Sequence, residues 1–407
     1  MSTEGITSQI GAFAREARSG WTRERFVLIG LLGVVLMGFA PSFQVYLFTE
    51  FLIVGLFALG FNLLYGYTGL LSFGHALFLA GGSYGLAITL RDLQPYVAEV
   101  VGSGLAPLVT FALGFVVAVA LVLVIAIPVG WLSVRLEEIY FALITLAFGM
   151  LGYSIILQDP YGLTNGTDGV IILLGVTEIG GAEFRIGDRQ TYYYLTAGIV
   201  LASIYALWRI VNSPFGMVCR SIRESPDRAA ALGVDVRFHR WMTFIASAFF
   251  VGIAGALMAG LANVASPYHS HWTESAVAVV ATVIGGASFF IGPLVGAFIF
   301  LYARWGISRY PVLEAHWELF MGVLIIVVVL YFKVGAAGGI YMLHAWLLDV
   351  QAAYERGGRG KAVAFVHESI HEQLRSGKAA VVGKLRSIGG TIRAAVRRVT
   401  SLGGAKS

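Results

Sequence analysis

Histidines are the side chains best suited to chemistry in this sequence, because imidazole can move a proton or bind a metal near neutral pH. His75 lies inside an apolar stretch, where an ionisable group marks a functional candidate by default. A neutral histidine bonded to a neighbouring backbone carbonyl is the alternative. His269 and His271 flank Ser270 at a spacing more typical of surface residues than of metal ligands. With no nucleophile and base converging elsewhere, we expect no catalytic residue, no metal and no cofactor in this chain.

The surroundings of His75 are polar for a membrane stretch. Residues 66–85 read GYTGLLSFGHALFLAGGSYG, with serines and glycines interrupting the apolar run. Such backbone is tolerated at membrane depth where it is packed in protein or lines a water-filled cavity. Close helix packing through small residues is the alternative. We therefore predict a translocation pathway here, with four candidate residues: Asn62, Ser72, His75 and Ser83.

A charged segment, residues 212–240, separates two long apolar stretches. Ser225 is a plausible N-cap followed by Pro226 at the first helical position, so a short helix is predicted to begin there. Gly233 is expected to end that helix. A short helix on the cytoplasmic face could contact a partner protein and transmit its movement to the membrane part. An ordinary basic loop that only sets topology is the alternative.

Composition sets the class. Hydrophobic residues make up 57% of the chain and charged residues 13%, which is far more apolar than a soluble domain. Several windows approach the roughly 20 apolar residues that a spanning helix needs. We therefore predict an all-α integral membrane protein. The single Cys219 excludes an internal disulfide, and the net charge of +5 reflects topology rather than substrate.

The membrane spans follow from the apolar runs. Residues 1–25 are basic and polar, which places the N-terminus inside, and the acidic segment 158–190 is expected outside. A cleaved signal peptide is the rival for the first run, but further spans follow it almost at once. The predicted single spans are residues 26–40, 45–65, 70–90, 105–133, 140–157, 192–210, 241–261 and 319–332.

Residues 275–303 raise a counting problem. One straight helix of that length would rise about 44 Å against a hydrocarbon core of about 30 Å. Glycines and Pro293 interrupt it, so two short crossings with a turn around residues 288–292 are predicted. The total becomes ten crossings, with both termini cytoplasmic. The basic tail, residues 349–407, then faces anionic lipid, as an interfacial helix or as a disordered segment.

Two expected features of other transporter classes are missing. No acidic residue falls near the middle of a predicted span, which disfavours an ion-coupled carrier. No Gly-Lys pair continues into Ser or Thr, so the chain has no P-loop for a nucleotide. If ATP drives this protein, another chain binds it.

The chain resembles the LivM-like permease subunits of branched-chain amino-acid ABC importers. The resemblance covers residues 52–332. It rests on five blocks in order: FNLLYGYTGLLSFGHALFLAGGSYG (61–85), IYFALITLAFG (139–149), LTNGTDG (163–169), NSPFGMVCRSIRESPDRAAALGVDV (212–236) and VIGGASFFIGPLVGA (283–297). After the last span the family has a basic, proline-containing stretch, whereas this sequence reads FKVGAAGGIYML.

The resemblance implies a transmembrane permease domain over residues 26–348, with a coupling loop at residues 212–240 that docks on an ATP-binding subunit. The coupling residues it implies are Arg223, Glu224, Asp227, Ala230 and Gly233. It also implies the remaining partners: a second permease subunit, an extracytoplasmic binding protein and membrane lipids, with ATP and magnesium held by the partner subunits and with no nucleic acid. An internal repeat is predicted from the loose echo of residues 66–85 in residues 285–296.

The expected location is the bacterial cytoplasmic (inner) membrane, and the expected function is ATP-driven import of a branched-chain or other hydrophobic amino acid. Related permeases carry urea or short-chain amides, and nothing in the predicted pathway separates a zwitterion from a neutral amide. A passive channel is the alternative from another class, recognised by solute flux without nucleotide.

Overall fold

The computed structural model describes residues 32–179, 182–310 and 335–339, together with seven positions between them: 316, 319, 320, 322, 323, 326 and 327. The predicted N-terminal segment, the basic tail and most of the predicted last span lie outside the described residues. The predicted first span is described from residue 32, and residues 32–37 are helical.

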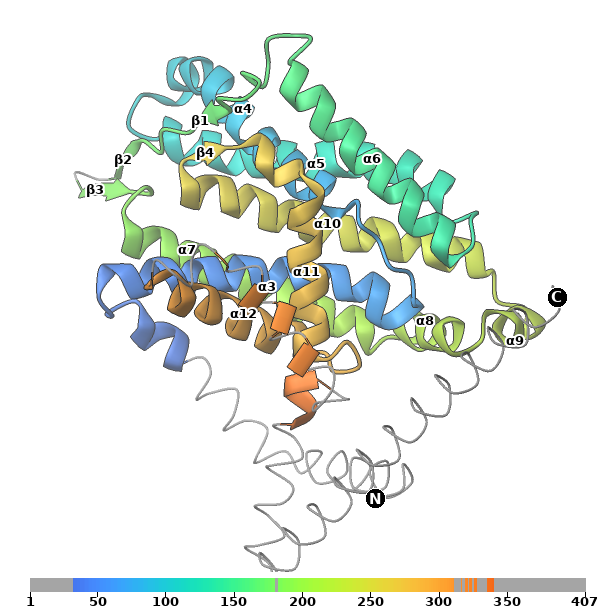
Figure 1. The fold of residues 1–407 in the computed structure, drawn as a ribbon. Helices are drawn as coiled ribbons and strands as arrows, with labels where there is room; N and C mark the ends of the chain where they lie inside the picture. The colour runs from blue at the N-terminus through green and yellow to red at the C-terminus, as the bar shows by residue number, and fades with distance from the viewer. Residues whose placement is uncertain are drawn as a thin grey trace, which may run out of the picture. The chain divides into compact units, whose positions relative to one another are not determined.

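Four long helices form the centre of the bundle and run alongside one another in Figure 1. They are α3 (Ser42–Thr68), α4 (His75–Val101), α5 (Ala106–Ser133) and α10 (Val236–Ala262). The most apolar window of α3 is 89% buried and that of α10 is 72% buried, against 28% for α5. Since α3 is apolar on every side, it can be enclosed by neighbours, and it forms the axis of the fold.

Two further helices lie at the periphery: α6 (Glu138–Gln158) and α7 (Arg189–Val211). Within the described residues, five helices are long and apolar enough to cross a membrane, namely α3, α5, α6, α7 and α10. α4 is absent from this group because glycines, a serine, His75 and the charged pair Arg91 and Asp92 lower its hydropathy. The prediction of a helical membrane protein is confirmed, while ten crossings and an internal repeat stay predictions.

α4 corrects one predicted boundary. A span was expected over residues 70–90, but residues 69–74 are not helical and the helix runs from His75 to Val101. Gly69 ends α3 in the left-handed region at φ 81°, a conformation that glycine adopts without strain. The extended segment then leads back into the bundle, so α4 begins beside neighbouring helices (Figure 1). We call residues 69–74 the first break.

The second predicted irregularity is also present. α11 (Trp272–Gly285) and α12 (Gly292–Ser308) are separate helices, and residues 286–291 between them are not helical. We call residues 286–291 the second break. α11 has 14 residues and rises about 21 Å, less than the roughly 30 Å of a hydrocarbon core. It also lies across α3 and α10 in Figure 1. The predicted break is therefore confirmed, but α11 alone is too short for a full crossing.

Short strands occupy the segment that was predicted to lie outside. β1 (Val170–Ile171) pairs with β4 (Val264–Ala265), and β2 (Val176–Ile179) pairs with β3 (Ala182–Arg185), both antiparallel. A 3-10 turn, η1 (Pro267–Ser270), follows β4. The spanning elements are all helical, as predicted, and the strands belong to the loops that connect them.

Candidate functional site

His75 is fully buried where the first break meets α4. Its Nδ1 lies 2.8 Å from Ser72 Oγ, and its Nε2 lies 2.8 Å from Ser247 Oγ on α10. Phe61, Phe78 and Phe244 surround the ring with edge-on contacts. The ring is therefore held at both nitrogens and on its apolar faces.

The hydrogen bonds fix the tautomer. Ser247 donates its hydroxyl proton to the Gly60 carbonyl at 2.6 Å, so its oxygen accepts from His75 Nε2–H. Ser72 then donates to Nδ1 and accepts from the Gly74 N–H at 3.3 Å. The alternative weighed from the sequence, a neutral histidine held by its neighbours, describes this geometry, with serine hydroxyls in place of a direct carbonyl bond.

The first break has its backbone satisfied from a distant helix. Ser275 Oγ on α11 accepts from the Ala76 N–H at 2.8 Å, which supplies a partner in the first turn of α4. On the other side, a Cβ at Gly74 would overlap the Thr145 carbonyl of α6. Helix α6 and the first break therefore pack backbone to backbone, as expected of polar backbone kept away from lipid.

The second break is held mainly by glycine packing. Cβ atoms at Gly285 or Gly296 would overlap backbone of the facing helix, and one at Gly335 would overlap Gly286. Asn62 on α3 adds one hydrogen bond, from Nδ2 to the Ala287 carbonyl at 3.3 Å. In the described part of the chain, the buried Asn62 Oδ1 has no hydrogen-bond partner. Gly335 belongs to the VGAAGG stretch where this sequence departs from the family pattern.

The fourth pathway candidate, Ser83, points elsewhere. Its Oγ lies 2.9 Å from His269 Nδ1 in η1, which ties α4 to the connection between α10 and α11. Burial lowers the pKa of His269 to about 4, so this imidazole is neutral at physiological pH. Thus one of the paired histidines in the loop is partly buried and bonded, although the sequence pattern was more typical of surface residues.

The four pathway candidates do not form one cluster. Ser72 and His75 are in direct contact, Asn62 contacts the second break, and Ser83 contacts η1. All four are buried, at 1% exposure or less. Their role in translocation stays a prediction; in the structure Asn62, Ser72 and His75 form hydrogen bonds at the two breaks, and Ser83 links α4 to η1.

The charged segment contains two short helices, and the second of them is the predicted one. α8 (Pro214–Glu224) begins after Ser213, whose Oγ accepts from the Gly216 N–H. α9 (Pro226–Ala231) begins after Ser225, whose Oγ accepts from the Arg228 N–H. Gly233 follows α9 in the left-handed region at φ 86°. The N-cap and the helix stop are both confirmed, because caps depend on local sequence.

All five predicted coupling residues are exposed to solvent. Leu232 beside them is 85% exposed. Buried Ala229, Ile222 and Cys219 hold the inner faces of the pair. Cys219 Sγ lies 3.2 Å from Thr243 Oγ1 on α10, consistent with a structural thiol.

Charged residues near the outer ends of three helices were missed from the sequence. Glu50 on α3 and Glu274 on α11 are half-buried, and both interact electrostatically with Arg304 on α12. Glu274 and Arg304 lie one residue beyond the predicted limits of 275–303. The argument against an ion-coupled carrier is therefore weaker than the sequence indicated.

The outer loops enclose an open polar cleft of about 810 Å³, lined by Arg91, Asp159, Asp168 and the block at residues 165–169. Asp159 Oδ1 accepts from the Thr164 N–H at 2.9 Å and the Leu163 N–H at 2.7 Å, and Oδ2 accepts from the Asn165 N–H at 3.0 Å. The bonds to Thr164, and then to its neighbours, hold the pKa of the Asp159 carboxyl below its usual range. This carboxylate therefore shapes the loop.

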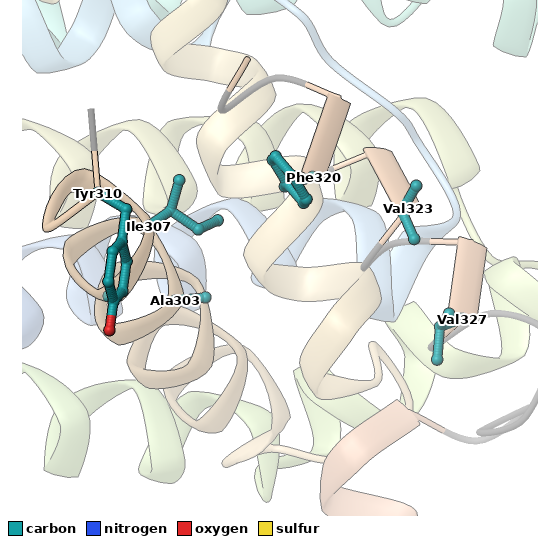
Figure 2. A pocket seen from close by; sticks show the side chains of 7 residues that line it. Ala303, Ile307, Tyr310, Phe320, Val323 and Val327 are labelled. Carbon is teal, nitrogen blue, oxygen red and sulfur yellow. The ribbon is translucent and has the colours of Figure 1, made fainter. Parts of the chain in front are cut away.

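A second cavity is an apolar groove of about 420 Å³. Figure 2 shows Ala303, Ile307 and Tyr310 on one side, facing Phe320, Val323 and Val327. It offers no charged side chain among these described residues, so it suits hydrocarbon and provides no partner for the charges of a zwitterion. We assign it no role in solute recognition.

Comparison with known proteins decides the class. The sequence profile of the family "Branched-chain amino acid transport system / permease component" matches residues 43–329. The chain belongs to this family. The match spans both breaks and the α8–α9 pair, so these features are part of a permease domain.

Individual relatives agree. This chain is 26% identical to the high-affinity branched-chain amino acid transport system permease protein LivM of Escherichia coli and 27% identical to LivM of Salmonella typhimurium. Each alignment covers 60% of this chain. The chain is also 27% identical to LivH of Escherichia coli over 70% of this chain and 90% of that protein. The chain spans 59% of the length of the two LivM proteins. No solved structure matches it.

The resemblance to LivM-like permeases is confirmed by these relatives. A permease-family member with five helices fit to cross a bilayer is a multi-pass protein of the inner membrane.

Proposed function

We propose that this chain is the permease subunit of an ATP-driven importer for branched-chain or other hydrophobic amino acids. The observation that carries the proposal is the exposed, doubly capped α8–α9 pair within a bundle that matches a branched-chain amino acid permease family. The pair supplies an exposed surface on one face of the protein, while buried Cys219, Ile222 and Ala229 pack its inner side against the bundle.

The proposed assembly has four kinds of chain. A second permease subunit completes the membrane part, and two ATP-binding subunits dock on the α8–α9 pairs and hold ATP and magnesium. An extracytoplasmic binding protein delivers the solute to the outer loops. ATP binding would close the two ATP-binding subunits, move the α8–α9 pairs and rock the bundles between outward-open and inward-open states.

The coupling contact is proposed for Glu224, Asp227, Ala230 and Gly233, all exposed. Asp227 lies in the first turn of α9, where a negative charge is favoured by the helix dipole. Gly233 sets the direction in which the chain leaves the pair. These residues would fit a groove of the ATP-binding subunit, as the resemblance implies.

Gly233 allows a sharp test of the coupling surface. Proline cannot adopt φ 86° and would also lose the Gly233 N–H bond to the Ala230 carbonyl, so Gly233→Pro should abolish uptake. Asparagine tolerates the left-handed region, and no side chain would collide with it, so Gly233→Asn should retain most uptake. Both variants should insert normally. Normal uptake by Gly233→Pro would contradict the assignment.

The substrate is the least constrained part of the proposal. Asn62, Ser72 and Ser83 carry no charge, which suits a neutral amide such as urea as well as a zwitterion. The names of the relatives favour branched-chain amino acids. Urea or a short-chain amide is therefore the alternative that the same experiment should examine.

The test is uptake by cells that lack this gene and by the same cells after the gene is restored. Labelled leucine and labelled urea are compared at the same energisation. Loss and rescue of leucine uptake would support the proposal. Rescue of urea uptake alone would replace the substrate, and equal flux in energised and de-energised cells would favour a passive channel.

A further inference from the structure

We propose that Arg223 is a positioning residue that transmits movement of α8 to both helix breaks, instead of serving only as a contact for the ATP-binding subunit. The inference rests on the proposed function, because it explains how a push on the α8–α9 pair reaches the membrane part. It begins from an exposed side chain on α8 that bonds to the C-terminal end of α3.

Arg223 bonds to the C-terminal end of α3. Its guanidinium donates to the Gly66 carbonyl, one of the last carbonyls of the helix, and its Cγ lies 3.6 Å from where a Cβ of Gly69 would be. Gly69 is the first residue of the first break. One turn earlier on α8, Arg220 lies over the Tyr67 ring with its Cζ 5.2 Å from the centroid.

Two cations at a helix C-terminus are favoured by the helix dipole and by unpaired carbonyls there. A charge-assisted hydrogen bond to a carbonyl is also stronger and more directional than a neutral one. The two arginines therefore attach α8 to the last turn of α3 at two points. A displacement of α8 has to move this turn or break the attachment.

The same turn of α3 touches the second break. Gly66 lies so close to Asn62 Oδ1 and the Ala287 carbonyl that a Cβ would overlap both. Asn62 also donates to the Ala287 carbonyl. Within the described residues, its buried Oδ1 has no hydrogen-bond partner. This oxygen can therefore accept a new hydrogen bond if α3 shifts.

The contacts therefore form one continuous path from Arg223 through Gly66 and Asn62 to Ala287, while Gly69 opens the first break at the same point. Packed backbone transmits displacement because it has no free space to absorb it. Moving α8 against α3 would act on the two breaks together, which alternating access through both of them requires.

The experiment uses the full importer, reconstituted in lipid, with Arg223→Ala, Arg223→Lys and the control Arg209→Ala. Arg209 is exposed in the last turn of α7, outside the coupling loop, and its replacement removes the same charge. ATP hydrolysis, leucine uptake, retention of the ATP-binding subunits and hydrogen exchange of residues 66–76 with and without nucleotide are measured on each protein.

We expect Arg223→Ala to keep its ATP-binding subunits and its hydrolysis while uptake per ATP falls about tenfold, as the loss of one charge-assisted hydrogen bond implies. The nucleotide-dependent change in exchange at residues 66–76 should vanish with it. Lysine can still donate to the Gly66 carbonyl, so Arg223→Lys should recover part of both. Arg209→Ala should match the wild type.

The outcomes separate the two proposals. Release of the ATP-binding subunits or loss of hydrolysis in Arg223→Ala would overturn transmission and make Arg223 a docking contact. Unchanged uptake per ATP, or an unchanged exchange response, would also overturn it. A wild-type importer whose exchange responds through Arg223 but which moves no leucine would contradict the proposed substrate and leave the transmission role standing.

Discussion

The two helix breaks are stabilised in different ways. The first break is fixed by directed hydrogen bonds: Ser72 and Ser247 to His75, and Ser275 to the backbone of Ala76. The second is fixed by shape, through glycines that let backbones meet without side chains between them. Hydrogen bonds can be exchanged one for another, whereas close packing tolerates little displacement.

The difference suggests that the two breaks have different mechanical properties. A break held by hydroxyls and an imidazole can rearrange if new partners are offered, which suits a segment beside a moving pathway. A break held by backbone contacts behaves as a stiff joint. The first break should therefore be sensitive to the loss of polar atoms, and the second to the addition of a methyl group.

The largest effect is expected at the second break. In Gly296→Ala the new methyl would overlap the Ala281 carbonyl oxygen, which belongs to backbone and has little freedom to move, so the loss should be about 3 kcal/mol or more. Gly306 lies on the same helix with nothing within 4 Å of its Cβ position, so Gly306→Ala is the matched control. Thermal unfolding of the purified proteins, followed by tryptophan fluorescence, measures both. Equal midpoints would contradict a packed joint.

A smaller effect is expected at the first break. Ser247→Ala removes the acceptor for His75 Nε2–H and leaves this buried N–H unpaired, at about 2 kcal/mol, while the Gly60 carbonyl keeps its bond within α3. Ser203 bonds only to the Ile199 carbonyl of its own helix, so Ser203→Ala should change the midpoint little. The same unfolding assay compares them. A Ser247→Ala protein as stable as Ser203→Ala would show that the network does not hold the break.

The smallest effect concerns the link between α4 and η1. The pKa of His269 is lowered from 6.5 to about 4, so below pH 6.5 the unfolded chain binds a proton that the folded chain does not. Stability from this group is complete above pH 6.5 and falls as pH drops towards 4, by at most about 1.4 kcal/mol per pH unit. Unfolding midpoints between pH 7 and 5 measure it. His269→Gln, which cannot titrate, should show a shallower fall, and an equal fall would assign the pH dependence to other groups.

Local features of the α8–α9 pair and of the second break could be predicted from the sequence, whereas the first break lay mostly inside a predicted span. The bounds of α9 are set by contacts within a few residues, made by Ser225, Pro226 and Gly233. The identities of these residues were therefore enough to predict where the helix begins and ends. The glycines of residues 285–292 likewise predicted an interruption, since they interrupt an apolar run too long for one crossing.

The long-range contacts could not be predicted. Ser247 and Ser275 are 172 and 199 positions from the residues they bond, and a serine in an apolar helix looks the same whether it bridges helices or bonds its own. Glu274 and Arg304 were missed because each lies one residue outside a predicted limit. Arg223 was assigned from the resemblance to an outward contact, and only the fold shows its bond to Gly66.

The most direct test of the account is transport by the purified assembly. The chain, its partner permease, the ATP-binding subunits and the binding protein are placed in liposomes, and labelled leucine is followed with ATP, with a non-hydrolysable analogue and without nucleotide. We expect accumulation against a gradient with ATP alone, and none when this chain is omitted. Equal leucine movement in all three conditions would contradict ATP-driven import through this chain.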